Sequence, residues 1–230
     1  MLTLGLILGV FGLAVIGSSD MLTIRKIVVE GGERLTDDDV QGMTNIKVGD
    51  NFIGVDLQAA TMRLQQHPWV RSARIFLQYP RLRVVIQERR PFVAVQLSKQ
   101  DLVWCDEEGF VLAPYSSQER ETQSIIIEGL GAAAGDANGS RIGNGVQWKA
   151  IRRLLRTSFS DLFVVDKLRF FAEWVDLFTQ EQQRIRLPLT GLNEALGRLQ
   201  PIWTLLEKRV FLHSLDLRFP GEIVYEGTPH

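Results

Sequence analysis

The chain has 230 residues, which is enough for one large domain or two modest ones. Its 26 Lys and Arg residues nearly balance 27 Asp and Glu residues, so the formal net charge of −1 gives no global attraction to nucleic acid or to an acidic surface. Hydrophobic residues make up 45% of the chain, which excludes disorder of the whole molecule. The single cysteine, Cys105, cannot form an intramolecular disulfide, and its apolar neighbours predict a buried, unreactive thiol.

The amino-terminal segment is apolar. Residues 2–16 contain only apolar residues, glycine and one threonine, and the uncharged run continues to Ser19. A helix over this run, at about 1.5 Å per residue, covers about 27 Å, close to the ~30 Å hydrocarbon core of a bilayer. No charge precedes Asp20, which argues against a cleaved signal peptide, and we interpret residues 1–19 as a transmembrane anchor. A buried core helix is the alternative, and the position of Arg25 after the run leaves the sidedness open.

The next segment predicts one strand and two helices. Residues 23–29 are rich in β-branched side chains and predict a strand that ends at the turn Glu30–Gly32. Thr36 predicts a helix start, because Asp39 follows at the spacing of a capping box. Asp56 opens a second helix, whose leucine and alanine residues recur on one face at helical spacing.

Two polar features of this segment could suggest a site. Asp37–Asp39 are consecutive, but consecutive residues on a helix point in different directions, so these carboxylates converge poorly on one metal ion. His67 lies beside Pro68 and Trp69 and has no carboxylate partner at a telling spacing, so we expect a packed or capping residue rather than a base. The sequence therefore predicts no metal site and no catalytic histidine here.

A β-hairpin follows, and with it a family resemblance. Residues 73–77 and 82–86 alternate between apolar and mostly polar side chains, which predicts two strands that each bury one face. The order strand, helix, helix, strand, strand, together with the strings Pro68–Ala73, Tyr79–Leu82 and Glu88–Pro91, resembles the POTRA module of the FtsQ/DivIB family of division proteins. Such a unit leaves a sheet edge open, and an open edge can accept a partner strand.

Residues 90–226 predict a second, larger domain that is rich in strands. Short apolar strands are predicted at Phe92–Gln96, Leu102–Cys105, Phe110–Leu112, Ser124–Ile127, Leu168–Phe178 and Arg184–Leu189. Asp106–Gly109 is typical of a solvated turn rather than of catalytic acids. The glycine- and alanine-rich residues 130–145 lack the Lys-Ser pair of a phosphate-binding loop and the distal glutamate of a calcium loop, which predicts a flexible loop.

Two helices are predicted in this domain. Val146–Arg156 has one apolar face, and its opposite face carries a basic stripe. The members of the stripe are Lys149, Arg152, Arg153 and Arg156. The stripe is either a solvated helix face or a contact for anionic lipid heads or an acidic partner. Gly191–Arg209 carries leucines at helical spacing, with a kink or break expected at Pro201.

The chain ends in a short motif that extends the resemblance. Residues 215–219 alternate between apolar and charged side chains, and a Pro-Gly turn precedes a last predicted strand at Glu222–Tyr225. The string Asp216–Phe219 resembles the Asp-Leu-Arg-aromatic signature of the FtsQ β domain. The chain is therefore identified as a member of the FtsQ/DivIB family, which implies an α+β fold with a transmembrane helix at 1–19, a POTRA domain (β-α-α-β-β) at 23–89 and a mixed, β-rich domain with flanking helices at 90–226.

The resemblance implies a cell-division scaffold that works by binding. Such a protein crosses the bacterial inner membrane once, at the division septum, with its carboxyl-terminal part in the periplasm. FtsB- and FtsL-type partners would dock on the last strands of the β domain, and the POTRA domain would contact other division proteins. Carried over by position, the candidate contact residues are Arg218, Phe219, Glu222, Ile223, Val224 and Tyr225.

The expected mode of binding is β-augmentation. A partner strand would pair with the edge at Glu222–Tyr225, while Arg218 would pair with a partner carboxylate. The alternative is that these residues only complete the sheet and pack its core.

Two other functions compete with this interpretation. POTRA modules also occur in secretion and outer-membrane assembly factors, but such proteins usually carry several modules, and this sequence shows one. A wall hydrolase needs paired carboxylates, a nucleophile with a base, or a metal cluster, and no such set emerges from a sequence with three histidines. We therefore expect no catalytic residue, no cofactor, no metal site and no nucleic-acid partner.

Overall fold

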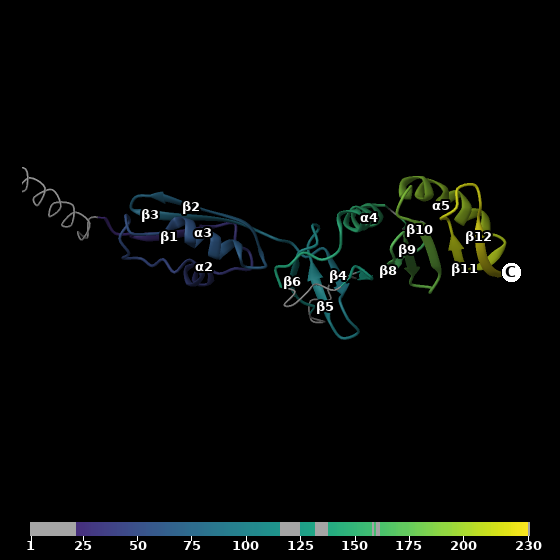
Figure 1. Ribbon diagram of the computed structural model, residues 1–230, viewed down its shortest axis with the longest axis horizontal. Coiled ribbons are helices and arrows are strands. Elements are labelled where there is room, and N and C mark those ends of the chain that lie inside the picture. Colours follow the sequence, from purple (N-terminus) through teal and green to yellow (C-terminus); the bar gives the residue numbers. More distant parts are fainter. Residues whose placement is uncertain (1–21, 116–124, 132–137, 158, 160–161, 230) are drawn as a thin grey trace, which may run out of the picture. The chain divides into compact units, whose positions relative to one another are not determined.

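The computed structural model describes residues 22–115, 125–131, 138–157, 159 and 162–229. The predicted anchor at residues 1–19 and the middle of the predicted loop, residues 132–137, lie outside these ranges. No helix within the described ranges is long and apolar enough to cross a membrane. The chain divides into two compact units, one that ends at Arg89 and one that begins at Arg90 (Figure 1).

The first unit has the predicted order of elements. These are β1 (Lys26–Glu30), α2 (Asp37–Thr44), α3 (Leu57–Gln65), β2 (Val70–Gln78) and β3 (Arg81–Glu88). Strand β3 lies in the centre of the sheet, parallel to β1 and antiparallel to β2. The strand-helix-helix-strand-strand order expected for a POTRA module is therefore confirmed, although β1 begins three residues later than predicted.

Both helices of this unit begin where the caps predict. The amide of Asp39 donates to the Thr36 hydroxyl oxygen at 3.2 Å, and the amide of Thr36 donates to the Asp39 carboxylate at 3.0 Å. Hydrogen bonds from the Thr36 hydroxyl and amide lower the pKa of Asp39. The Asp56 carboxylate accepts from the amide of Ala59 at 2.9 Å. Because these caps satisfy amides that have no partner inside the helix, they fix both helix starts.

The core of the first unit lies between the two helices and one face of the sheet. Its buried members include Val40 from α2, Ala60 and Leu64 from α3, and alternate residues of the hairpin. The hairpin residues are Ala73, Leu82, Val84 and Ile86. The predicted alternation of the hairpin is therefore correct, and the opposite face of β2 and β3 is left to polar and half-exposed side chains.

The described part of the second unit contains one nine-stranded sheet and two helices. The helices are α4 (Gly145–Arg156) and α5 (Leu192–Glu207). The strands are β4 (Val93–Gln96), β5 (Leu102–Cys105), β6 (Val111–Pro114), β7 (Ile126–Glu128), β8 (Val165–Phe170), β9 (Trp174–Thr179), β10 (Arg184–Pro188), β11 (Val210–Asp216) and β12 (Val224–Pro229). Their order across the sheet is β12-β11-β10-β9-β8-β7-β4-β5-β6.

Both helices cover the same face of this sheet (Figure 1). The residues that meet across the strands on the covered face are Val95, Ile127, Leu168, Leu177, Ile185 and Leu215. They share one buried core with Trp148 of α4 and with Leu199 and Trp203 of α5. Among the described elements no helix covers the opposite face, so the side chains there meet solvent or one another.

Two expectations for the second unit were wrong, and a third, the kink or break at Pro201, was wrong as to the break. Residues 168–178 form parts of two antiparallel strands, because the chain turns between Phe171 and Trp174, where an amide-to-carbonyl bond of 2.9 Å closes the turn. Helix α5 is continuous through Pro201, so the break does not occur, and burial of Leu199 and Trp203 offsets the one missing backbone bond. The last strand begins at Val224 rather than at residue 222 and continues to Pro229.

The turn after β5 is also different from the prediction. Asp106 is 5% exposed rather than solvated, and its carboxylate accepts from the amides of Glu108 and Phe110 at 2.9 Å each. Its neighbour Cys105 is fully buried, as predicted, and burial, together with the negative charge of Asp106, raises the pKa of the thiol to about 12. Because the thiolate is the reactive form, this cysteine is inert in the folded protein.

Candidate partner-binding site

Strand β12 lies at one end of the nine-stranded sheet. It pairs antiparallel with β11 on one side, where Leu215 lies opposite Tyr225 and Asp216 lies opposite Val224. On its other side no described strand pairs with it. The outward N–H and C=O groups of β12 can therefore accept a further strand.

Strand β6 forms the other end of the sheet, and there the chain covers its own edge. The amide of Val111 donates to the Ser140 carbonyl at 2.9 Å, and the amide of Gly139 donates to the Val111 carbonyl at 2.8 Å. Pro114, at the end of β6, has no N–H to donate. Of the two ends of this sheet, β12 is therefore the one whose outer backbone is available.

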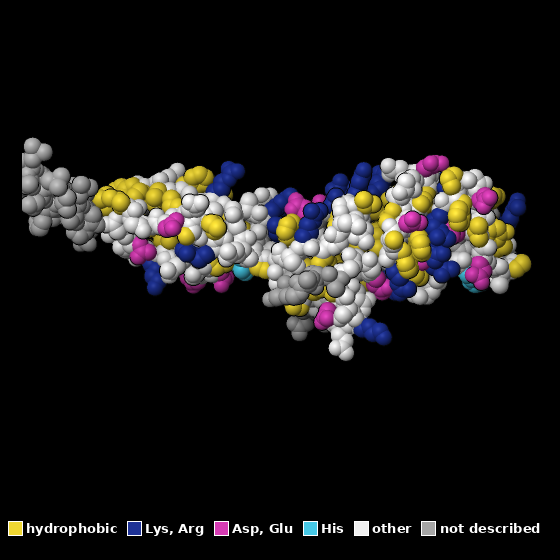
Figure 2. Space-filling model, viewed as in Figure 1, with side chains coloured by type: hydrophobic (Ala, Val, Ile, Leu, Met, Phe, Trp, Pro, Cys, Tyr) yellow, Lys and Arg dark blue, Asp and Glu magenta, His cyan; other side chains and the backbone are white. Residues whose placement is uncertain are grey.

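Exposed hydrophobic side chains surround β12. Val224 and Tyr225, within the strand, are 53% and 50% exposed. Figure 2 shows hydrophobic side chains at the end of the second unit that carries β11 and β12. We call this surface the apolar margin; its members are Phe211, Phe219, Ile223, Val224 and Tyr225. Large apolar side chains gathered at an open sheet edge are typical of a protein-binding surface.

Arg218 lies next to the apolar margin but already has a partner. Its Nε and Nη2 atoms donate to the Asp216 carboxylate at 3.0 and 2.8 Å. Its guanidinium also lies 4.8 Å from the ring centre of Trp174 and 5.3 Å from that of Phe219. The sequence interpretation placed Arg218 at this site but missed Asp216 as its partner. The sequence could have indicated this pair, because Asp216 and Arg218 are two residues apart on an extended segment and therefore point to the same face.

Burial and hydrogen bonding act in opposite directions on Asp216. Partial burial alone would raise the pKa of its carboxyl group. Hydrogen bonds from the side chain and amide of Arg218, together with the charges of Arg218 and Arg186, outweigh burial and hold the pKa below its ordinary value. Asp216 is therefore ionised at neutral pH and fixes the direction of the Arg218 side chain.

The Asp216–Arg218 pair continues into a network across three strands. Arg186 of β10 donates from Nε and Nη2 to both carboxylate oxygens of Asp176 of β9, at 2.7 and 3.0 Å. Its Nη1 lies 3.9 Å from Asp216. The hydrogen bond with Asp176 is the main reason that the pKa of Arg186 is raised. Sequence reasoning missed this network, although the alternation of Arg184 and Arg186 with apolar residues indicated that both point away from the core.

A groove of about 490 Å³ lies beside Arg218. Its walls come from the start of α4, the turn that precedes β9, the end of β10 with the residues after it, and the segment before β12. The lining residues that matter for binding are Trp174, Pro188, Leu189, Arg218 and Phe219. Asn144, Thr190 and the acidic Glu173 also line the groove, so its walls are mixed, with aromatic and aliphatic side chains beside one cation and one anion.

The other predicted contact residues lie close to β12 but not within it. Glu222 and Ile223 are exposed and precede the strand, in the turn where the Glu222 amide donates to the Phe219 carbonyl at 3.4 Å. Residues 226–229, which the sequence interpretation did not include, complete β12. Glycine and proline within them have low strand propensity, so pairing with β11 rather than local preference defines this end of the strand.

The basic stripe of α4 is partly engaged. Arg152 donates from Nη1 to the carbonyl oxygen of Glu107 at 2.6 Å, and Arg156 lies 3.6 Å from the Glu107 carboxylate. Lys149 and Arg153 are exposed, and neither forms an ion pair with a described residue. Two of the four cations therefore serve the turn between β5 and β6.

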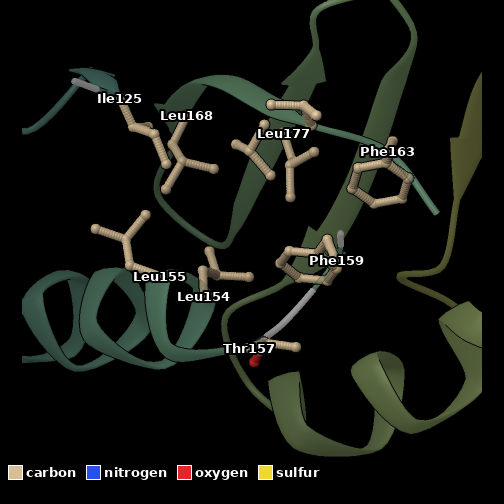
Figure 3. Close-up of a pocket in the computed structure, with 10 residues that line it drawn as sticks. Ile125, Leu154, Leu155, Thr157, Phe159, Phe163, Leu168 and Leu177 are labelled. Carbon is tan, nitrogen blue, oxygen red and sulfur yellow. The ribbon is translucent and has the colours of Figure 1, made fainter. Parts of the chain in front are cut away.

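An apolar pocket of about 280 Å³ lies at the carboxyl end of α4 (Figure 3). Leu154 and Leu155 of α4 and Leu168 and Leu177 of the sheet line it, together with Phe159 and other residues near the start of β8. Its described lining contains no titratable side chain, and its one hydroxyl, that of Thr157, donates to the Arg153 carbonyl at 2.9 Å. In the same described ranges, no three metal-ligating side chains come together.

Comparison with known proteins gives the following similarities. The family described as "POTRA domain, FtsQ-type" matches residues 22–89. The chain is 29% identical over 218 residues to the cell division protein FtsQ of Anaeromyxobacter sp. (strain K), which covers 88% of this chain and 70% of that protein. It is 25% identical over 222 residues to the FtsQ of Syntrophotalea carbinolica, covering 91% and 76%. It is also 25% identical over 181 residues to the FtsQ of Bartonella bacilliformis, covering 78% and 54%.

Proposed function

This chain belongs to the FtsQ/DivIB family of cell division proteins, and from that premise we propose that it is a binding scaffold of the division machinery whose docking edge is β12. The observation that carries the proposal is the contrast between the two ends of the nine-stranded sheet. Strand β6 is covered by residues of its own chain, whereas β12 has an open outer edge bordered by the apolar margin.

The proposed mode of binding is β-augmentation. A partner strand pairs with the outer edge of β12, and main-chain hydrogen bonds set its register. Side chains of the partner that point toward the covered face meet Tyr225, and those that point toward the helix-free face meet Val224, because adjacent residues of a strand face opposite ways. The groove beside Trp174 and Arg218 then selects among partner sequences.

Arg218 keeps donors available for a partner. Its Nε and Nη2 atoms bond to Asp216, and no bond from its Nη1 atom to a described residue is seen. A partner carboxylate near the groove can therefore bond to Nη1 while Asp216 holds the guanidinium in place. A hydrogen bond between charged groups that is shielded from water contributes about 1.5–3 kcal/mol.

We further propose FtsB- and FtsL-type division proteins as the partners of β12. The names of the relatives support a role in cell division, and the resemblance of Asp216–Phe219 to the family signature is what suggests these partners. In the same proposal residues 1–19 anchor the chain in the bacterial inner membrane, and both described units lie on the periplasmic side at the septum. The first unit contacts other division proteins, and no step of the proposed role requires catalysis.

The proposal is tested by co-purification of the full chain with an FtsB-type partner. We expect Val224→Glu combined with Tyr225→Glu to abolish capture, because two carboxylates then border the edge that the partner must approach. Leu205→Glu is the matched control, since Leu205 is equally exposed but lies on α5. Unchanged circular dichroism would show that the double variant folds. Equal capture by the double variant and the control would refute the assignment of β12.

A further inference from the structure

Three segments of the first unit meet where β1 begins. We call this region the proximal end; it comprises residues 22–26, 47–53 and 79–81. The amide of Gly49 donates to the Ile24 carbonyl at 2.8 Å, and the amide of Arg25 donates to the Pro80 carbonyl at 2.8 Å. The backbone bonds fix the three segments to one another, so their side chains form one surface.

The proximal end exposes large apolar side chains. Ile53 is 69% exposed, and Val48 and Tyr79 are more than half exposed. The ring of Tyr79 lies edge-on to that of Phe52, with 5.6 Å between centres, so the aromatic side chain is held in place. Figure 2 shows hydrophobic side chains gathered over the end of this unit that holds the β2–β3 turn. Because these side chains are exposed, Ile53, Val48 and Tyr79 are not needed as apolar residues to fill the core of the unit.

Basic side chains surround the apolar ones. Four cations of the proximal end are exposed, and none forms an ion pair with a described residue; they are Arg25, Lys26, Lys47 and Arg81. The single acidic residue in the three segments is Asp50, whose carboxylate accepts from the amide of Lys47 at 2.7 Å. Aliphatic and tyrosine side chains ringed by unpaired cations match the chemistry of a bilayer surface, where aromatic rings lie among the headgroups and cations lie near phosphates.

The length of chain before the proximal end points to the same occupant. The uncharged run proposed as the anchor ends at Ser19, and Leu22 is already bonded to the unit through the amide of Phe52 at 2.6 Å. Three residue steps span at most about 11 Å. The polar layer on each side of the hydrocarbon is roughly 5–7 Å thick. A span that ends at Ser19 therefore leaves the proximal end no room to move far from the headgroups.

We propose that the proximal end is a membrane-contact surface that holds the first unit against the bilayer from which the chain emerges. Ile53, Val48 and Tyr79 enter the interfacial layer, and the cations lie beside the phosphates of anionic lipids. This inference rests on the anchor of the proposed function and does not depend on β12. The contact would orient the first unit relative to the bilayer, because a unit that is held at one end can point in fewer directions.

The experiment uses the full chain in vesicles of phosphatidylethanolamine and phosphatidylglycerol. Cys105 is buried, so an introduced exposed cysteine can be labelled alone with an environment-sensitive fluorophore such as NBD. We label Ile53→Cys and, as a control in the same unit, Gln87→Cys. Gln87 is exposed and lies six residues along β3 from Arg81, roughly 20 Å away. We expect a blue-shifted emission and several-fold stronger quenching by brominated lipids at position 53 than at position 87.

A second variant tests the surface without the label at its centre. With the label on Val48→Cys, the added substitution Ile53→Glu should remove most of the blue shift, because a carboxylate then faces anionic lipid. Ile53 is so exposed that this change leaves the fold intact, which circular dichroism checks. Vesicles of phosphatidylcholine should give a weaker shift, and an equally large shift there would overturn the role of the cations.

Flotation of the vesicles separates the inference from its premise. Chain that floats with the vesicles but shows the same emission at positions 53 and 87 would overturn the membrane contact and leave the anchor standing. Chain that does not float would overturn both, while capture of a partner by β12 would still be measured independently. A blue shift at position 53 that needs an added protein rather than lipid would also overturn the inference, because the surface would then bind protein.

Discussion

The ion-pair network beneath Arg218 makes the sharpest prediction for the second unit. Asp176 has a side chain that is 4% exposed, and both of its carboxylate oxygens accept from Arg186. Replacing Arg186 by methionine keeps much of the side-chain volume but leaves the carboxylate of Asp176 without its cation. A buried carboxylate that loses its partner keeps the cost of burial and loses the compensating bonds.

The magnitude follows from how deeply the pair is buried. Removing one member of a fully buried ion pair costs about 3–5 kcal/mol. Because the Arg186 side chain is itself 23% exposed, water can reach part of the site, and we reduce the expected loss to about 2–4 kcal/mol. For a domain of this size the loss corresponds to a drop in Tm of roughly 5–12 °C.

Thermal and urea unfolding, followed by tryptophan fluorescence, measure this loss. Four of the five tryptophans lie in the second unit, and Trp174 lies 5.4 Å from Arg186, so the signal reports on the right region. The double variant Asp176→Leu with Arg186→Met removes both charges and should recover most of the stability. The single variant Asp176→Leu completes the cycle. If the stability lost by the double variant equals the sum of the losses of Asp176→Leu and Arg186→Met, the two residues do not act as a pair and the reasoning is wrong.

The remaining predictions concern backbone and pH. Gly109→Ala should cost roughly 3–5 kcal/mol in urea unfolding, because its φ of +92° disfavours a side chain and an added Cβ would overlap the buried ring of Trp148. Gly227→Val should weaken partner capture more than it lowers Tm, because its Cβ would lie 2.7 Å from the Phe211 carbonyl and push β12 away from β11. The lowered pKa of Asp216 stabilises the folded state above the unfolded value of about 3.9, so this part of the stability should disappear as the pH falls through the folded pKa, whereas Asp216→Asn should lack this loss in acid unfolding.

Local signals in the sequence were sufficient for the first unit. Helix starts at Thr36 and Asp56 depend on side chains that bond to amides three residues away, so they can be read without any tertiary contact. The hairpin of β2 and β3 was equally readable, because apolar residues recur at every second position on each side of Tyr79-Pro80 and so define one buried face. The family signature at Asp216–Phe219 directed attention to the end of the second unit that carries β12, and the assignment of that end as a binding site stays a prediction.

Features that depend on pairing between distant strands could not be read in this way. The turn between β8 and β9 contains neither glycine nor proline, so residues 168–178 looked like one apolar strand. The Asp176–Arg186–Asp216 network arises because β9, β10 and β11 are neighbours in one register, and β11 reaches that place only after α5. The limits of β12 were missed for the same reason, since they follow from its pairing with β11.

The two edge strands of the large sheet differ in whether other residues of the chain cover their outer backbone. A long exposed edge strand with apolar side chains invites aggregation, and proteins usually protect such edges. This chain protects the β6 edge with residues 139–140 and with Pro114, so the same sheet has one protected edge and one open edge. On the helix-free face the charges of β7 to β11 and the guanidinium of Arg218 pair largely with one another, so that face offers a partner little unpaired charge. A partner that pairs with β12 gains both the unused backbone bonds and the cover of the apolar margin, and for that reason the edge rather than the face is where binding should occur.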